Sequence, residues 1–293
     1  MRSSKPTTPC SSVSPASFAS SETSSRPLWP FFALVAAVSL PFWALGALVD
    51  STGSTPMRLP ASALMFLCPA IAAVVLVHRR EGRAGVVQLL KRVGDFARVP
   101  RKRWYAIAVA TPAAVALATY GGMRAAGADS TLPMPLMTAP ALFATFLVAA
   151  AFEEVGWTGY ATAPMLRRWG ALSASLLLGA FWGVWHLVPL LQAHHGALWI
   201  AGWFVGTVAA RLVMVWLYLH TGGSVPAAMC LHAMLNVYAA LIPHYDLDRT
   251  PVVTGGITAL LAAGVVVAAR RGQGRKVWRV GRGKPSTPAE VPC

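Results

Sequence analysis

Charged residues and cysteines are scarce in this sequence of 293 residues. Asp, Glu, Lys and Arg make up only 12% of it, roughly half the share of an ordinary soluble protein. This scarcity excludes a soluble enzyme of usual composition, and a hydrophobic content of 56% excludes a disordered chain. The four cysteines form no Cys-x-x-Cys pair, which argues against a disulfide framework and a thiolate metal site (Cys10, Cys68, Cys230 and Cys293). A protein that crosses a membrane several times is the class that remains.

The formal net charge of +15 is unevenly distributed. Nine Lys and Arg residues lie in 79–103 and seven lie in 270–284, whereas the apolar stretches between them are nearly free of charge. No basic face exists along which a nucleic acid would lie, so we expect no nucleic-acid partner. Clustered Lys and Arg beside apolar spans are typical of the positive-inside bias of membrane proteins. We expect the segment 79–103 to face anionic membrane lipid.

The apolar pattern predicts an all-α polytopic membrane protein with about eight transmembrane helices, at about 20 residues per crossing. This membrane-embedded domain occupies 28–270. Residues 1–27 are rich in Ser, Thr and Pro and are expected to form a disordered cytoplasmic tail, and 271–293 a basic cytoplasmic tail. The predicted spans are 28–49, 60–78, 104–121, 139–160, 171–191, 197–219, 224–242 and 251–270.

Orientation follows from the linkers between the spans. If both termini are cytoplasmic, the cytoplasmic parts hold 21 Lys and Arg residues and the opposite side holds three. This imbalance predicts both ends inside. Together with the Arg-rich and Ala-rich composition, it indicates an integral protein of a bacterial plasma membrane.

Polar side chains within the spans form a short list. A charge at bilayer depth costs about 2.5–3.5 kcal/mol, so each such residue needs a reason to be there. Counted at 1.5 Å per residue from the cytoplasmic flanks, most of the group lies roughly 15–22 Å deep on three helices. We therefore expect these groups to meet near the middle of the membrane. The list is Glu153, Glu154, His186, Arg211, His232 and Asn236.

A carboxylate, two imidazoles and an amide around one point suit hydrolysis of an amide bond. Adjacent Glu153 and Glu154 point about 100° apart on a helix, so one faces the site and its neighbour supports it. The facing carboxylate would take a proton from water, while the imidazoles bind a metal or polarise a carbonyl. The amide of Asn236 would donate to a developing oxyanion. We expect this centre to open toward the cytoplasmic half of the membrane.

Three motifs in order resemble those of the CPBP family, intramembrane proteases related to the CAAX prenyl endopeptidases and to bacteriocin-processing and immunity proteins. They are EEVGWTGY at 153–160, FWGVWH at 181–186 and HAMLN at 232–236. The resemblance spans about 139–242 and implies an endopeptidase that cleaves a membrane-associated substrate. This substrate would be a peptide or a lipidated protein, with a prenylated CAAX-type protein as one candidate. It implies a site of Glu153, Glu154, His186, His232 and Asn236. A divalent metal, zinc by expectation, would be held by Glu153, His186 and His232.

Two positions depart from the family pattern. The family has Arg where this sequence has Thr158, and Phe where it has Trp182, which keeps an aromatic wall. The family Arg would lie four residues after Glu154, which is a favourable spacing for an ion pair on a helix. Arg211 is the one Arg within a span, and we predict that it replaces the missing partner of Glu154.

Several alternatives stay open on sequence alone. The Glu pair could be a solvated helix end, the two histidines could be ordinary core residues, and Arg211 could be a snorkelling or purely structural cation. A proton-coupled transporter also uses acids and histidines in mid-membrane, although carriers often repeat their halves and no repeat is seen here. A non-catalytic immunity or interaction protein of the same fold is the third class. The adjacent His194 and His195 are expected to be solvated in an external loop.

Overall fold

The fold was analysed in a computed structural model, which describes residues 27–49, 59–99, 101–128, 131–132 and 134–271. Within these ranges the regular structure is entirely helical, which confirms the predicted all-α class. All but the last residue of the predicted disordered tail, 1–27, and all but the first residue of the predicted basic tail, 271–293, lie outside the described residues.

Each predicted span falls on a helix. Length and composition mark six helical segments as able to cross a membrane, and one of them, Leu136–Gln192, runs over two predicted spans. A shorter apolar helix, Val225–Leu241, completes the set. The long helices are α1 (Trp29–Leu48), α2 (Cys68–Lys91), α3 (Arg103–Ala125), α4 (Ala139–Glu154), α5 (Thr162–Trp185), α7 (Ala197–His220), α8 (Val225–Leu241) and α9 (Arg249–Arg271), with the short α6 (Leu187–Gln192) after α5.

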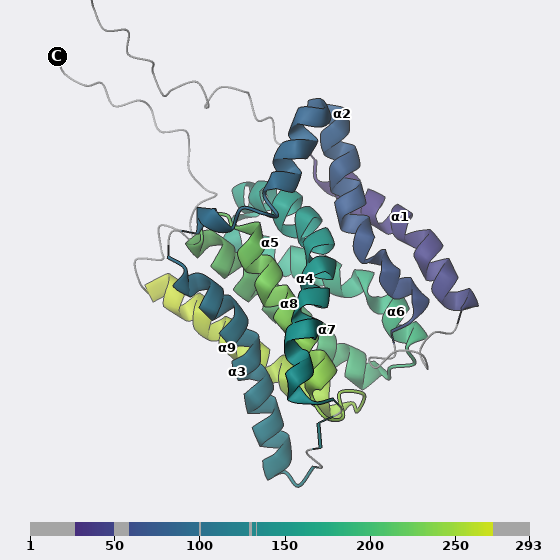
Figure 1. The fold of residues 1–293 in the computed structure, drawn as a ribbon, viewed down its shortest axis with the longest axis vertical. Helices are drawn as coiled ribbons and strands as arrows, with labels where there is room; N and C mark the ends of the chain where they lie inside the picture. The colour runs from purple at the N-terminus through teal and green to yellow at the C-terminus, as the bar shows by residue number, and fades with distance from the viewer. Residues whose placement is uncertain (1–26, 50–58, 100, 129–130, 133, 272–293) are drawn as a thin grey trace, which may run out of the picture.

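Two glycines turn the chain where a continuous helix would overrun. Gly82 in α2 has φ of 65° and Gly170 in α5 has φ of 75°, a left-handed conformation that costs glycine little. At Gly82 the helix folds back on itself as a hairpin, seen at the top of Figure 1. At Gly170 the direction changes between the two spans predicted at 139–160 and 171–191, so the second span starts as expected.

Small residues bring the central helices close together. A Cβ added at Gly202 of α7 would meet the backbone nitrogen of Val252 in α9 at 2.6 Å, so this contact requires glycine. Close approach through small residues is typical of helices that pack in a membrane. The helix α7 contacts α5 and α9, and α8 contacts α3 and α4, as Figure 1 shows for this central group.

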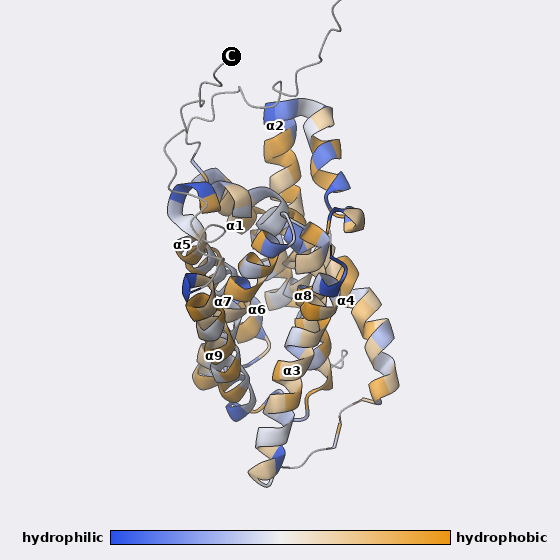
Figure 2. Cartoon of the chain, turned by 90° about the vertical axis from the view of Figure 1, so that its left-hand side faces the viewer, coloured by the Kyte–Doolittle hydropathy of each residue, from blue (hydrophilic) through white to orange (hydrophobic). Residues whose placement is uncertain are grey.

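The outer surface of the bundle is apolar along its length. Leu117 is 70% exposed and Leu260 is 75% exposed, each on a helix of span length. Figure 2 shows hydrophobic residues over most of the helices, while hydrophilic residues gather at the turn of α2. A surface of this kind belongs in lipid. The chain is an integral membrane protein, as its composition predicts.

Candidate active site

The two acidic residues within the membrane stand at the end of α4, just before a π-helical segment, Val155–Ala161. Glu153 is 6% exposed and Glu154 is fully buried, so the alternative of a solvated helix end is wrong. Gly156 lets the π segment press on α2, since a Cβ there would lie 2.6 Å from the Pro69 backbone oxygen. Single π turns inside α-helices occur frequently at functional sites.

Glu154 is held by a buried cation from α7. Nη1 of Arg211 donates to Oε2 at 3.0 Å and Nη2 donates to Oε1 at 3.1 Å, and both side chains are fully buried. The hydroxyl of Thr158 also donates to Oε2. The predicted replacement of the family Arg by Arg211 as the partner of Glu154 is therefore confirmed, and the snorkelling alternative for Arg211 is wrong.

The same carboxylate fixes the proton of His232. Nδ1 of His232 lies 3.0 Å from Oε1 of Glu154, and a carboxylate paired with Arg211 can only accept a hydrogen bond. Nδ1 therefore carries the hydrogen. In the neutral imidazole this leaves the lone pair on Nε2.

His186 is fixed in the same way by the backbone. Its Nδ1 lies 2.8 Å from the carbonyl oxygen of Trp182, one turn earlier. Because a carbonyl oxygen only accepts, Nδ1 again carries the hydrogen and Nε2 the lone pair. His186, between α5 and α6, and His232, on α8, thus present the same nitrogen as a base.

Trp182 contacts every charged or imidazole group of the site except Glu154. Its Nε1 donates to Oε2 of Glu153 at 2.8 Å, and Trp157 donates to the same oxygen at 3.1 Å. The Trp182 ring lies 5.8 Å from that of His186 and 5.0 Å from that of His232, between centroids. The guanidinium carbon of Arg211 lies 4.3 Å from its ring centroid. From the sequence, Trp182 is expected only to provide an aromatic wall, and no role is predicted for Trp157.

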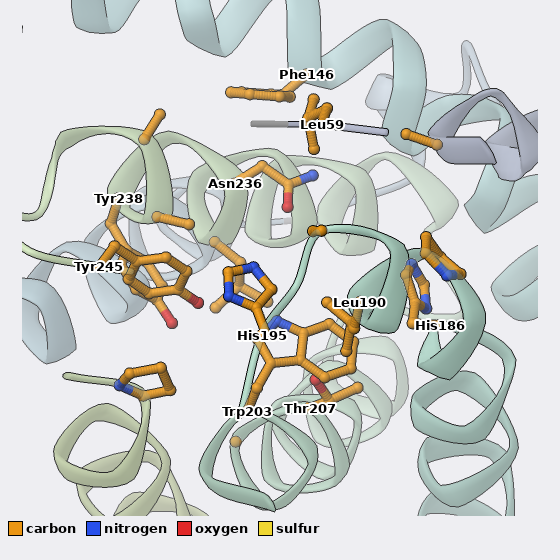
Figure 3. A pocket seen from close by; sticks show the side chains of 18 of the residues that line it. Leu59, Phe146, His186, Leu190, His195, Trp203, Thr207, Asn236, Tyr238 and Tyr245 are labelled. Atoms are coloured by element: carbon orange, nitrogen blue, oxygen red, sulfur yellow. The ribbon is translucent and has the colours of Figure 1, made fainter. Parts of the chain in front are cut away.

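A cavity of about 1060 Å³ joins the groups that the sequence predicts to meet. Four of them line it, namely Glu153 from α4, His186 after α5, and His232 and Asn236 from α8. Figure 3 shows His186 and Asn236 on two sides of this space, with His195 and Trp203 also at its wall. Glu154 and Arg211 do not line it and lie behind this wall. The proposed division between a facing and a supporting carboxylate thus matches the arrangement.

The cavity extends in a direction that the sequence analysis did not predict. It runs from Glu153 to the loops around 193–196 and 242–248, and none of the described residues between Cys68 and Leu136 lines it. The predicted opening toward the half with the basic segment 79–103 is therefore wrong. His195 is also not simply solvated, because it lines the cavity and stacks on Trp199 at 3.6 Å between centroids.

The side chains predicted to bind a metal ion are Glu153, His186 and His232. In the part of the chain that the structure describes, no three His, Cys, Asp or Glu side chains are arranged to hold an ion. One oxygen of Glu153 is already occupied by two indole N–H groups. As placed, Glu153, His186 and His232 do not fit a zinc coordination shell.

Fold and site together define a polytopic α-helical membrane protein with a carboxylate–imidazole centre buried between α4, α5, α7 and α8. Residues 135–238 match the family model described as type II CAAX prenyl endopeptidase Rce1-like. A CAAX prenyl protease 2 from Methanococcus maripaludis is 28% identical over 137 residues, which cover 44% of this chain. These matches confirm the resemblance to the CAAX prenyl endopeptidase family. The matched region covers 49% of that relative, so the chain spans about half the length of the curated protein it matches.

Proposed function

We propose that this chain is an intramembrane endopeptidase in which Glu153 activates a water molecule. The observation that carries the proposal is the shared orientation of His186 and His232, whose Nδ1 atoms are both tied to acceptors while their side chains line one cavity with Glu153. The match to the CAAX endopeptidase family supports the reaction type.

The reaction follows from the protein groups alone. Oε2 of Glu153 accepts two indole hydrogens, which stabilises the carboxylate and leaves Oε1 to take a proton from water. The second hydrogen of this water points to the Nε2 lone pair of one of the two histidines, His186 or His232, which orients its oxygen toward the substrate. The water oxygen bonds to the peptide carbonyl carbon, and the C–N bond then breaks as the proton passes to the leaving nitrogen.

Asn236 is the residue to which we assign stabilisation of the tetrahedral intermediate. Its amide lines the cavity, and no hydrogen bond to another described residue occupies it. An amide N–H aimed at the developing oxyanion is worth about 2.7–4 kcal/mol in other hydrolases. We assign Asn236 this role in peptide hydrolysis.

The test is cleavage by the purified, detergent-solubilised protein. A complex peptide mixture and a farnesylated CAAX peptide are incubated with wild type and with Glu153→Gln, and new termini are identified by mass spectrometry. We expect Glu153→Gln to lose roughly 10²- to 10⁴-fold in rate. Equal cleavage by the two proteins, or none by wild type, would overturn the proposal. Metal analysis of the same samples tests the zinc prediction. One zinc ion per chain in wild type, lost on substitution of Glu153, would support it.

The non-catalytic alternative loses its main support. It rested on Thr158, which leaves Glu154 without the family Arg, but Arg211 supplies that cation through α7. The transporter alternative is not favoured by any feature of the described site.

A further inference from the structure

The cavity of the candidate active site occupies one half of the bundle. Its lining comes from residues 59–66 just before α2, from α4 up to Glu153, from His186 and α6, and from the adjoining ends of α7, α8 and α9. Loop residues after α6 and after α8 also line it, among them Ala193, His195, His244, Tyr245 and Asp246. Among described residues, these loops lie at the end of the bundle opposite the hairpin turn of α2 at Gly82.

The other half is closed by packed side chains. Beyond Glu154 lie Trp157, Arg211, Leu217 and Val225, each less than 2% exposed. Arg92 covers this packing, donating to the carbonyl of Gly159 and, at 3.4 Å in each case, to the Tyr218 hydroxyl and the Gly223 carbonyl. A substrate therefore reaches Glu153 from the half that contains the cavity.

Charge assigns a side of the membrane to each half. The closed half carries the segment 79–103, with nine Lys and Arg residues, and Arg167 and Arg168. Positively charged linkers remain in the cytoplasm. The loop around 242–248 at the cavity end instead carries Asp246 and Asp248. The cavity half is thus the extracytoplasmic one.

The rim of the cavity has one apolar and one polar side. Leu59, Leu64 and Val148 line it and are 38%, 47% and 61% exposed, so this side faces lipid. His195, His244 and Asp246 stand on the loop side, where water begins. Such a rim suits a substrate polypeptide that emerges from the lipid into water at that point.

We propose that the substrate is the extracytoplasmic juxtamembrane segment of a membrane-anchored protein, entering from the outer half of the bilayer. This rests on the proposed endopeptidase function and narrows its substrate class. A CAAX-type peptide lipidated and presented in the cytoplasm does not reach Glu153 by this route.

The test uses two matched alanine-to-cysteine variants of the full chain. Cys10 and Cys293 are replaced by Ser, and the buried Cys68 and Cys230 are retained. Ala193→Cys places a thiol on the cavity wall, whereas Ala84→Cys places one on the exposed second arm of α2. Intact spheroplasts are treated with a membrane-impermeant maleimide–polyethylene glycol, and labelling is compared with that of disrupted membranes.

We expect Ala193→Cys to be labelled in intact spheroplasts and Ala84→Cys only after disruption. Labelled Ala193→Cys should then cleave the peptides found in the activity test at least tenfold more slowly, with Ala84→Cys within twofold of its unlabelled form. The reverse labelling pattern would overturn the access route while leaving the protease function intact. Failure of wild type to cleave any peptide would instead overturn the function, because labelling reports access independently of activity.

Discussion

The guanidinium of Arg211 and the carboxylate of Glu154 form a two-bond ion pair between α7 and α4, at 3.0 and 3.1 Å, with both side chains fully buried. The pair links two helices that are far apart in sequence and that bound the candidate active site. Through Glu154 it also sets the hydrogen position on His232. Glu154 on α4 thus determines which ring nitrogen of His232, on α8, carries the hydrogen.

Breaking this pair from either side should destabilise the protein strongly. Arg211→Met leaves a buried carboxylate without its cation, and removal of one partner of a buried pair costs about 3–5 kcal/mol. Glu154→Gln leaves the cation unpaired and should cost a similar amount. The double variant should be no less stable than either single one, because no lone charge remains. Unfolding free energies in mixed micelles measure this, and additive losses would contradict it.

Moving the cation to the π segment that follows α4 should restore the stability lost in Arg211→Met. In the Arg211→Met background, Thr158→Arg places a guanidinium four residues after Glu154, in the space that Arg211 vacates. We expect this double variant to recover stability relative to Arg211→Met. Thr158→Arg alone should destabilise the protein, because it adds a second cation to a position that is 3% exposed. Thermal unfolding of the four proteins measures this, and the absence of rescue would show that a cation in the π segment cannot replace Arg211.

Trp182→Phe should slow catalysis while preserving the fold. The substitution keeps an aromatic ring but removes the N–H that donates to Glu153. A hydrogen bond to a charged group is worth about 1.5–3 kcal/mol, so kcat should fall roughly 10- to 100-fold with little change in KM. Trp185→Phe is the matched control, because its indole donates to the hydroxyl of Ser39 and not to a carboxylate. An equal loss in both variants would indicate a packing effect only.

Gly156→Ala should destabilise the contact between the π segment and α2. The added methyl would lie 2.6 Å from the backbone oxygen of Pro69, which cannot move without shifting the helix. Overpacking of this kind costs about 1–3 kcal/mol. Gly159→Ala is the control, since its methyl first meets the end of the Leu89 side chain at 3.3 Å. Thermal unfolding should separate the two variants, and equal midpoints would contradict the assignment.

The sequence predicts the helices well because apolar length is a local property. All eight predicted spans coincide with helices, and the change of direction near residue 170 follows from a glycine at a boundary of apolar segments. The helix that runs on past 78 to Lys91 was not predicted, since only the left-handed conformation of Gly82 lets it turn back.

Side-chain partners were predictable only where chemistry left few choices. Arg211 was the single cation within a span, so the need of Glu154 for a partner identified it. The indole donors of Trp157 and Trp182 were not identifiable among eleven tryptophans, most of which suit a membrane boundary or a core equally well. The spacing of Trp157 four residues after Glu153 was the one signal that could have found it. The direction of the cavity depends on how whole helices lean, which no single segment encodes.

The π segment Val155–Ala161 also fixes how many residues must separate α4 from α5. A π turn holds one residue more than an α turn, so the segment sets the angular phase between α4 and α5. Deleting one residue from it would rotate the preceding carboxylates by about 100° relative to the helices that follow. Glu153 would then leave the two indoles, and Glu154 would leave Arg211, although every functional residue would still be present. In this stretch of seven residues, spacing carries as much information as identity, and homologous sequences aligned with a gap here should differ in their chemistry.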